Sequence, residues 1–77
     1  MSMNILIVIV NTILSNKGRV CIEKLSRSMK LRDDLNFDSL DLAELTVRIE
    51  AQFGIDIFED GLVDTIGGIF DKLSIHE

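Results

Sequence analysis

The segment 39–53 narrows the choice of folds more than any other part of the chain. Apolar side chains recur in it at helical spacing, and together they form one stripe. They are Leu42, Leu45, Ile49 and Phe53, reinforced by Val47 and Ala51. Glu44 and Arg48 lie four residues apart on another face, in the order that stabilises a helix. Because Gly54 follows at a common helix-ending position, the sequence predicts an amphipathic helix over residues 39–53.

Residues 3–16 have the same periodicity, with apolar side chains on one face. The β-branched residues among them also suit a strand. Length and spacing favour a helix, and Gly18 lies where a helix C-cap is expected. A first helix is therefore predicted over residues 3–16.

The final helix is predicted near residues 66–74, and Asp64 or Thr65 can cap it. Two adjacent glycines, Gly67 and Gly68, would weaken it by roughly 1 kcal/mol each relative to alanine. A glycine pair inside a helix suggests close backbone packing against a neighbouring segment.

Residues 17–38 form a long connection with scattered apolar residues. These are Ile22, Leu25, Met29, Leu31, Leu35 and Phe37. Since a structureless loop of this length is uncommon in a small domain, we expect these side chains to pin it to the core. The first three are spaced to share a helical face for a turn or two.

The predicted fold is all-α: a small four-helix bundle with three longer helices and one short helix near residues 59–63. The 77 residues fit a single domain spanning 1–77, which we expect to be a monomer. A chain this short has little room for a large active-site cleft, so an enzyme is not expected. Its lone Cys21 forms no internal disulfide, which suits a cytoplasmic location.

The apolar residues 5–10 could be mistaken for a targeting segment. They lack a basic region before them and a small-residue cleavage site after them. The stretch is also too short to cross a bilayer. No membrane span is predicted.

Charge divides the chain into two parts. Residues 1–32 carry six basic residues and one acidic residue, whereas residues 33–77 carry two basic and twelve acidic residues. The acidic part argues against nucleic acid as a partner, because phosphate contacts need clustered lysine and arginine. It favours partners with basic surfaces.

Chemistry is most evident around Ser39, which lies at the mouth of the predicted helix between Asp38 and Asp41. In one interpretation Asp38 is the N-cap and Asp41 completes a capping-box-like pair, which makes Ser39 an ordinary first-turn residue. A calcium loop is a second interpretation, with Asp34, Asn36 and Asp38 at its first, third and fifth positions. It lacks the glycine at the sixth position and the glutamate at the twelfth, so no metal site is predicted.

The third interpretation is a resemblance to the acyl carrier protein family. Asp34-Leu35, then Asp38-Ser39-Leu40, then an acidic helix ending at Phe53 look like the family's central motif. An apolar first helix, a long loop and a last helix opening at Thr65-Ile66 extend the resemblance over nearly the whole chain.

The resemblance implies that a phosphopantetheinyl transferase attaches 4′-phosphopantetheine from coenzyme A to Ser39. The arm would then carry acyl or aminoacyl groups as thioesters to acyl-loading and acyl-processing enzymes. The acidic helix would bind these partners through Leu40 and through an acidic face of Asp38, Asp41, Glu44 and Glu50.

Fatty acid, polyketide and nonribosomal peptide biosynthesis all use such carriers. Members often have a proline soon after the second helix, where this chain has Ile57-Phe58-Glu59. That difference and the basic first 32 residues favour a specialised pathway. The alternative function is an unmodified helical module that binds a basic partner.

Overall fold

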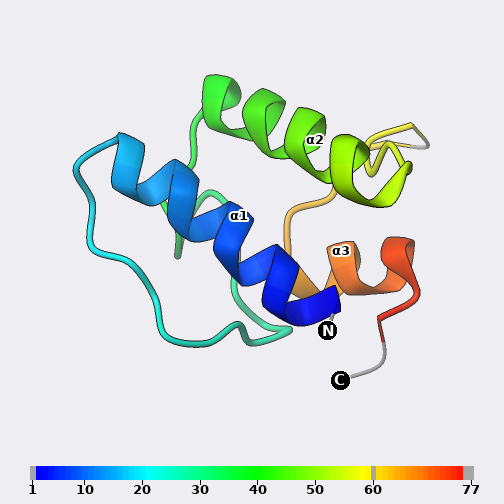
Figure 1. The fold of residues 1–77 in the computed structure, drawn as a ribbon, viewed down its shortest axis with the longest axis horizontal. Helices are drawn as coiled ribbons and strands as arrows, with labels where there is room; N and C mark the ends of the chain where they lie inside the picture. Colours follow the sequence, from blue (N-terminus) through cyan, green and yellow to red (C-terminus); the bar gives the residue numbers. More distant parts are fainter. Residues whose placement is uncertain (1, 60, 76–77) are drawn as a thin grey trace.

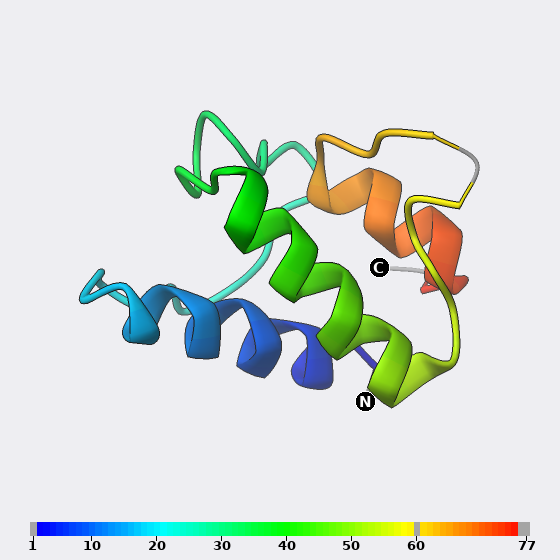
Figure 2. The ribbon, with the colours of Figure 1, turned by 90° about the horizontal axis from the view of Figure 1, so that it is seen from above.

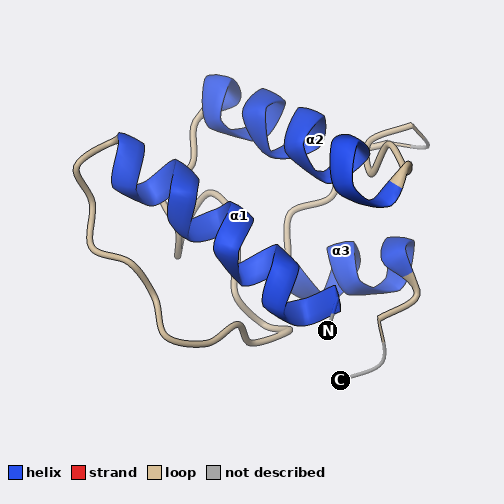
Figure 3. Ribbon diagram, in the orientation of Figure 1, coloured by secondary structure: helices blue, strands red, loops and turns tan. Residues whose placement is uncertain are grey.

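The computed structural model describes residues 2–59 and 61–75. Over these residues the chain forms three α-helices and no β-sheet (Figure 3). The helices are α1 (Ser2–Asn16), α2 (Ser39–Phe53) and α3 (Ile66–Leu73). The all-α prediction is confirmed, and so is the choice of a helix over a strand for the first segment. No described helix is long and apolar enough to cross a bilayer.

The helix ends follow the local chemistry of the sequence. Gly18 has a φ of 72° just after α1, and Gly54 has a φ of 71° at the end of α2. Glycine adopts this left-handed conformation without the steric cost that a side chain brings. Thr65, one of the two predicted caps, is the N-cap of α3: its Oγ1 accepts a hydrogen bond from the Gly68 N–H at 3.0 Å.

The predicted fourth helix near residues 59–63 is wrong for the residues described around position 60, where the chain turns instead. The Asp56 side chain accepts a hydrogen bond from the Phe58 N–H at 3.0 Å. Such a short-range side-chain bond offers the backbone an alternative to helical hydrogen bonding. Gly61 has a φ of 138°, which no helix contains. The residues that the structure describes therefore form three helices rather than four.

The helices enclose one core. α2 returns obliquely over α1 in roughly the opposite direction, and α3 runs in the same general direction as α2 (Figures 1 and 2). Of the three helices, α1 and α2 make the most extensive contact. The fully buried residues of the core come from all three helices, the long loop and the turn. They are Leu6, Val10, Ile13, Leu31, Leu45, Ile49, Ile57, Ile66, Ile69 and Phe70.

The long loop between α1 and α2 passes beneath the helices and comes up beside the start of α3 (Figure 1). Its apolar side chains pin it to the core as predicted, with Leu25, Leu31, Leu35 and Phe37 buried and Ile22 and Met29 packed at the edge. It contains turns rather than a helical stretch.

Backbone hydrogen bonds also hold this loop to the residues around the start of α3. The Leu31 N–H donates to the Asp64 carbonyl at 2.7 Å, and the Ile66 N–H donates to the Met29 carbonyl at 2.9 Å. The Gly67 N–H donates to the Arg27 carbonyl at 2.9 Å. A β-carbon at position 67 would lie 2.9 Å from that same carbonyl oxygen. The close packing expected from the glycine pair is therefore present at Gly67.

Candidate functional site

Ser39 is the first residue of α2, and it is exposed. Asp38 before it is the N-cap, with extended backbone dihedrals. Its Oδ1 accepts a hydrogen bond from the Asp41 N–H at 3.0 Å, while Asp41 Oδ2 accepts one from the Asp38 N–H at 2.9 Å. The predicted capping pair is confirmed. It fixes the direction in which the chain enters α2, and so it fixes the place of Ser39.

The chain changes direction sharply at Asn36, just before the cap, and it is anchored to the core on both sides of that residue. Asn36 has a φ of 61°, a left-handed conformation that asparagine tolerates better than most residues. Leu35 and Phe37 flank it, and both are buried. The Phe37 N–H also donates to the Leu31 carbonyl at 3.0 Å. Two core side chains thus hold the segment that leads to Ser39.

The carboxylates proposed for a calcium loop have other uses here. Asp34 Oδ2 accepts a hydrogen bond from the Lys30 N–H at 2.7 Å, and Asp38 caps α2. Within the part of the chain that the structure describes, no cluster of three or more metal-binding side chains occurs. These contacts stabilise the loop and the helix start.

Lys17 follows α1 and reaches across to the start of α2. Its Nζ donates a hydrogen bond to Asp41 Oδ2 and lies 3.6 Å from Asp38 Oδ2. The contact joins residues that are 24 positions apart in the sequence. Four functional groups therefore meet at the N-terminus of α2: the carboxylates of Asp38 and Asp41, the ammonium group of Lys17 and the hydroxyl of Ser39.

The burial of Asp41 corrects the sequence prediction that it lies on an exposed acidic face. Only 6% of the residue is exposed, because its carboxylate turns inward to Lys17 and to the Asp38 N–H. A side chain held in this way stabilises the helix start and offers little surface to a partner. The other predicted face residues are accessible: Asp38, Leu40 and Glu50 are exposed, and Glu44 is half-buried.

Two exposed apolar residues of α2, Leu40 and Val47, share one face of the helix. Leu40 is 80% exposed and Val47 is 65% exposed. Residues seven positions apart lie two turns apart on one helix face, so both side chains point outward from the same face of α2. The sequence prediction placed Val47 and Ala51 with the buried stripe, and this is wrong, because both are exposed. The spacing of Val47 from Leu40, rather than its apolar character, was the informative signal.

The pKa of Asp38 lies below its ordinary value of 3.8. The largest cause is the hydrogen bond from the Asp41 backbone N–H, which favours the charged form. The Lys17 ammonium group lowers it further. Asp38 therefore stays charged while it caps α2.

This depressed pKa predicts a loss of stability in acid. Because the folded-state pKa lies below the unfolded one, the stabilisation is complete above pH 3.8 and is lost as the pH falls through the folded value. Asp38→Asn keeps a capping oxygen but removes the charge. Urea unfolding from about pH 6 to about pH 2 is expected to show a flatter acid limb for Asp38→Asn than for the wild type. Parallel acid limbs would contradict the assignment.

Cys21 lies apart from this site. Cys21 is exposed in the long loop, with its Sγ 3.7 Å from the Asn11 carbonyl oxygen. His76 lies outside the described residues.

Comparisons with known proteins address the identity of this site. A family model described as "Phosphopantetheine attachment site" matches residues 19–69, which include Ser39. An acyl carrier protein of Thermotoga maritima is 37% identical over 62 residues, which cover 78% of this chain and 76% of that protein. An acyl carrier protein of Zymomonas mobilis is 38% identical over 52 residues, which cover 68% of this chain and 65% of that protein. No solved structure gives a significant match.

The family match covers more than half of the chain, and it favours a carrier over an unmodified interaction module. The similarity to the two acyl carrier proteins points the same way. This chain belongs to the phosphopantetheine-binding family that includes the acyl carrier proteins, and it is a non-catalytic carrier with a phosphopantetheine attachment site.

Proposed function

We propose that Ser39 is the residue to which 4′-phosphopantetheine is attached. Its exposed position at the start of α2, inside the matched region, is the observation that supports this most. Unpaired backbone N–H groups at a helix N-terminus favour a nearby negative charge, and a phosphodiester at Ser39 would lie there. The side chain also leaves the first turn outward, so a transferase can approach it.

Attachment is a phosphoryl transfer from coenzyme A. The Ser39 hydroxyl gives up its proton to a base of the transferase, and its oxygen forms a bond to the phosphorus that bears pantetheine. The bond from that phosphorus to the bridging pyrophosphate oxygen breaks, and adenosine 3′,5′-bisphosphate leaves. The thiol at the end of the arm then holds the cargo as a thioester.

Intact-mass measurement tests the attachment site. The protein is incubated with coenzyme A and a broad-specificity phosphopantetheinyl transferase, and the modified peptide is then located by fragmentation. A single phosphopantetheine on the peptide containing Ser39 is expected. Modification of Ser26 or Ser28 in the long loop would refute the proposal.

Partner enzymes are proposed to bind the exposed side of α2. Asp38, Glu44 and Glu50 supply negative charge there, and Leu40 and Val47 supply apolar contact. Charge of this sign steers encounter with basic surfaces, while a buried apolar contact adds affinity. Asp41 is left out of this binding face, because its carboxylate is buried against Lys17.

Reversing the accessible charges is expected to slow the encounter with the transferase. Glu44→Lys with Glu50→Lys should lower kcat/KM for modification by about tenfold at low salt, and the difference should shrink as salt screens it. Steady-state rates across a salt series measure this. Glu23→Lys combined with Glu59→Lys makes the same charge change on exposed residues outside α2. An equal loss in both double variants would mean that only net charge matters.

The cargo is proposed to be an acyl or aminoacyl group in a specialised biosynthetic pathway. The basic loop and the absence of proline after α2, which distinguish the chain from typical carriers of primary fatty acid synthesis, support this. We also propose a single monomeric carrier domain in the cytoplasm, where the exposed thiol of Cys21 would remain reduced. Mass measurement after loading with acyl and aminoacyl donors tests the cargo class.

A further inference from the structure

The charges around Ser39 pose a problem for the proposed modification. Ser39 follows Asp38 directly and lies two residues before Asp41, and both are carboxylates. Coenzyme A brings a pyrophosphate to the hydroxyl, and the product keeps a phosphodiester there. Like charges a few ångströms apart repel each other, by about 1 kcal/mol in water and more where water is partly excluded.

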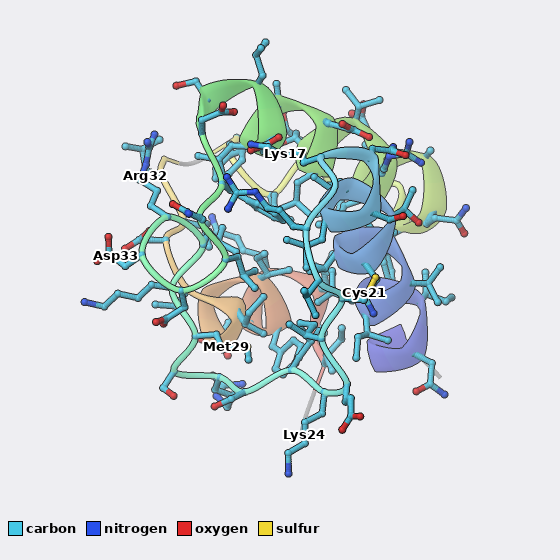
Figure 4. All side chains as sticks on the ribbon, turned by 90° about the vertical axis from the view of Figure 1, so that its left-hand side faces the viewer. Lys17, Cys21, Lys24, Met29, Arg32 and Asp33 are labelled. Carbon is cyan, nitrogen blue, oxygen red and sulfur yellow. The ribbon has the colours of Figure 1, made fainter. Side chains whose placement is uncertain are left out.

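Lys17 supplies a positive charge that reduces this repulsion. Its ammonium group binds Asp41 Oδ2 and lies 3.6 Å from Asp38 Oδ2, so one cation serves both carboxylates. In Figure 4 it lies beside the start of α2, reached from the end of α1. Asp41 Oδ2 also accepts the Asp38 N–H, which couples the ion pair to the helix cap.

The Lys17–Asp41 ion pair is more buried than an ordinary surface ion pair. The Lys17 side chain is 25% exposed and the Asp41 side chain is 8% exposed. Pairs shielded in this way are screened less by salt than exposed pairs. Removing one partner leaves the other buried and unpaired. The Arg27–Asp71 pair, at 2.7 Å, is far more exposed, at 45% and 69%.

We propose that Lys17 is a positioning residue for phosphopantetheine transfer. It offsets one of the two negative charges of the Asp38–Asp41 pair and holds the first turn of α2, so that the Ser39 hydroxyl meets the pyrophosphate in a fixed place and with less repulsion. This inference depends on the proposed modification of Ser39. It means that Lys17, which follows α1, contributes to a reaction that takes place at Ser39 on α2.

The test compares transfer kinetics of Lys17 variants. Lys17→Met should lower kcat by about tenfold, in line with one uncompensated charge near the reacting group. The KM for the carrier should not rise, because the variant is more acidic and meets a basic transferase at least as readily. Lys17→Arg should restore most of the rate. Lys17→Met combined with Asp41→Asn should also recover, since the amide removes the unpaired charge and still accepts the Asp38 N–H.

Arg27→Met is the matched control. It removes a cation from another ion pair, with Asp71, that contacts neither Asp38 nor Asp41. Its melting temperature should change without loss of kcat, which separates a local electrostatic effect from general destabilisation. Equal kcat for wild type and Lys17→Met would overturn the inference, and so would failure of both rescue variants when circular dichroism shows them folded. Failure of the wild type to accept phosphopantetheine on Ser39 would overturn the proposed function instead.

Discussion

Ser39→Ala is expected to accept no phosphopantetheine at all. The transfer forms a bond to the serine oxygen, and alanine has no atom that can replace it. The fold should survive, because Ser39 is exposed and no hydrogen bond of its side chain occurs among the described residues. Exposed substitutions of this kind change the free energy of unfolding by about 0.5 kcal/mol or less. The all-or-none result would therefore report chemistry rather than folding.

Intact mass after incubation with transferase and coenzyme A measures this outcome, and thermal melts of the same samples confirm the fold. Ser28→Ala is the matched control, since Ser28 is also an exposed serine but lies in the long loop, outside the helices. It should be modified like the wild type. Phosphopantetheine on Ser39→Ala protein would show that another residue is the attachment site.

Phe70→Ala is expected to cause the largest loss of stability. The ring is 1% exposed and lies in α3, facing the core that the three helices share. Removing such a ring costs about 3–5 kcal/mol through lost transfer energy and the cavity left behind. The Arg27 guanidinium, 5.8 Å from the ring centroid, loses a cation–π contact as well. The total free energy of unfolding of a small domain is only about 5–15 kcal/mol.

Urea unfolding followed by circular dichroism measures the loss, with Phe58→Ala as the control because that ring is only half-buried. If Phe70→Ala does not fold, the smaller change Phe70→Leu is measured instead. Its free energy of unfolding is expected to lie between that of the wild type and zero. A loss below about 1 kcal/mol for Phe70→Ala would contradict the central place of this ring in the core.

Local patterns made much of the fold predictable. The apolar stripe of α2, its capping aspartates and Gly54 act over three or four residues, so the bounds 39–53 follow from the sequence itself. The position of Ser39 at the start of this helix follows in the same way. The turn found in place of the predicted short helix near 59–63 was not predictable, because a side-chain hydrogen bond, from the Phe58 N–H to Asp56, favours the turn over a helix.

Long-range contacts explain the rest. An aspartate in the first turn of a helix has the same local pattern whether it faces solvent or a lysine. Only the crossing of α1 and α2 brings Lys17 to Asp41 and buries the carboxylate. The same crossing decides which side of α2 is covered, so Val47 is exposed although it is apolar.

The hydrogen bonds between the long loop and the start of α3 also bear on how the molecule opens. Leu31 and Ile66 donate across this junction, and the bridge between Lys30 and Thr65 lies between them. Movement of α3 away from the core would break these bonds and leave their N–H groups unpaired. The loop and α3 therefore form one cooperative unit in local unfolding.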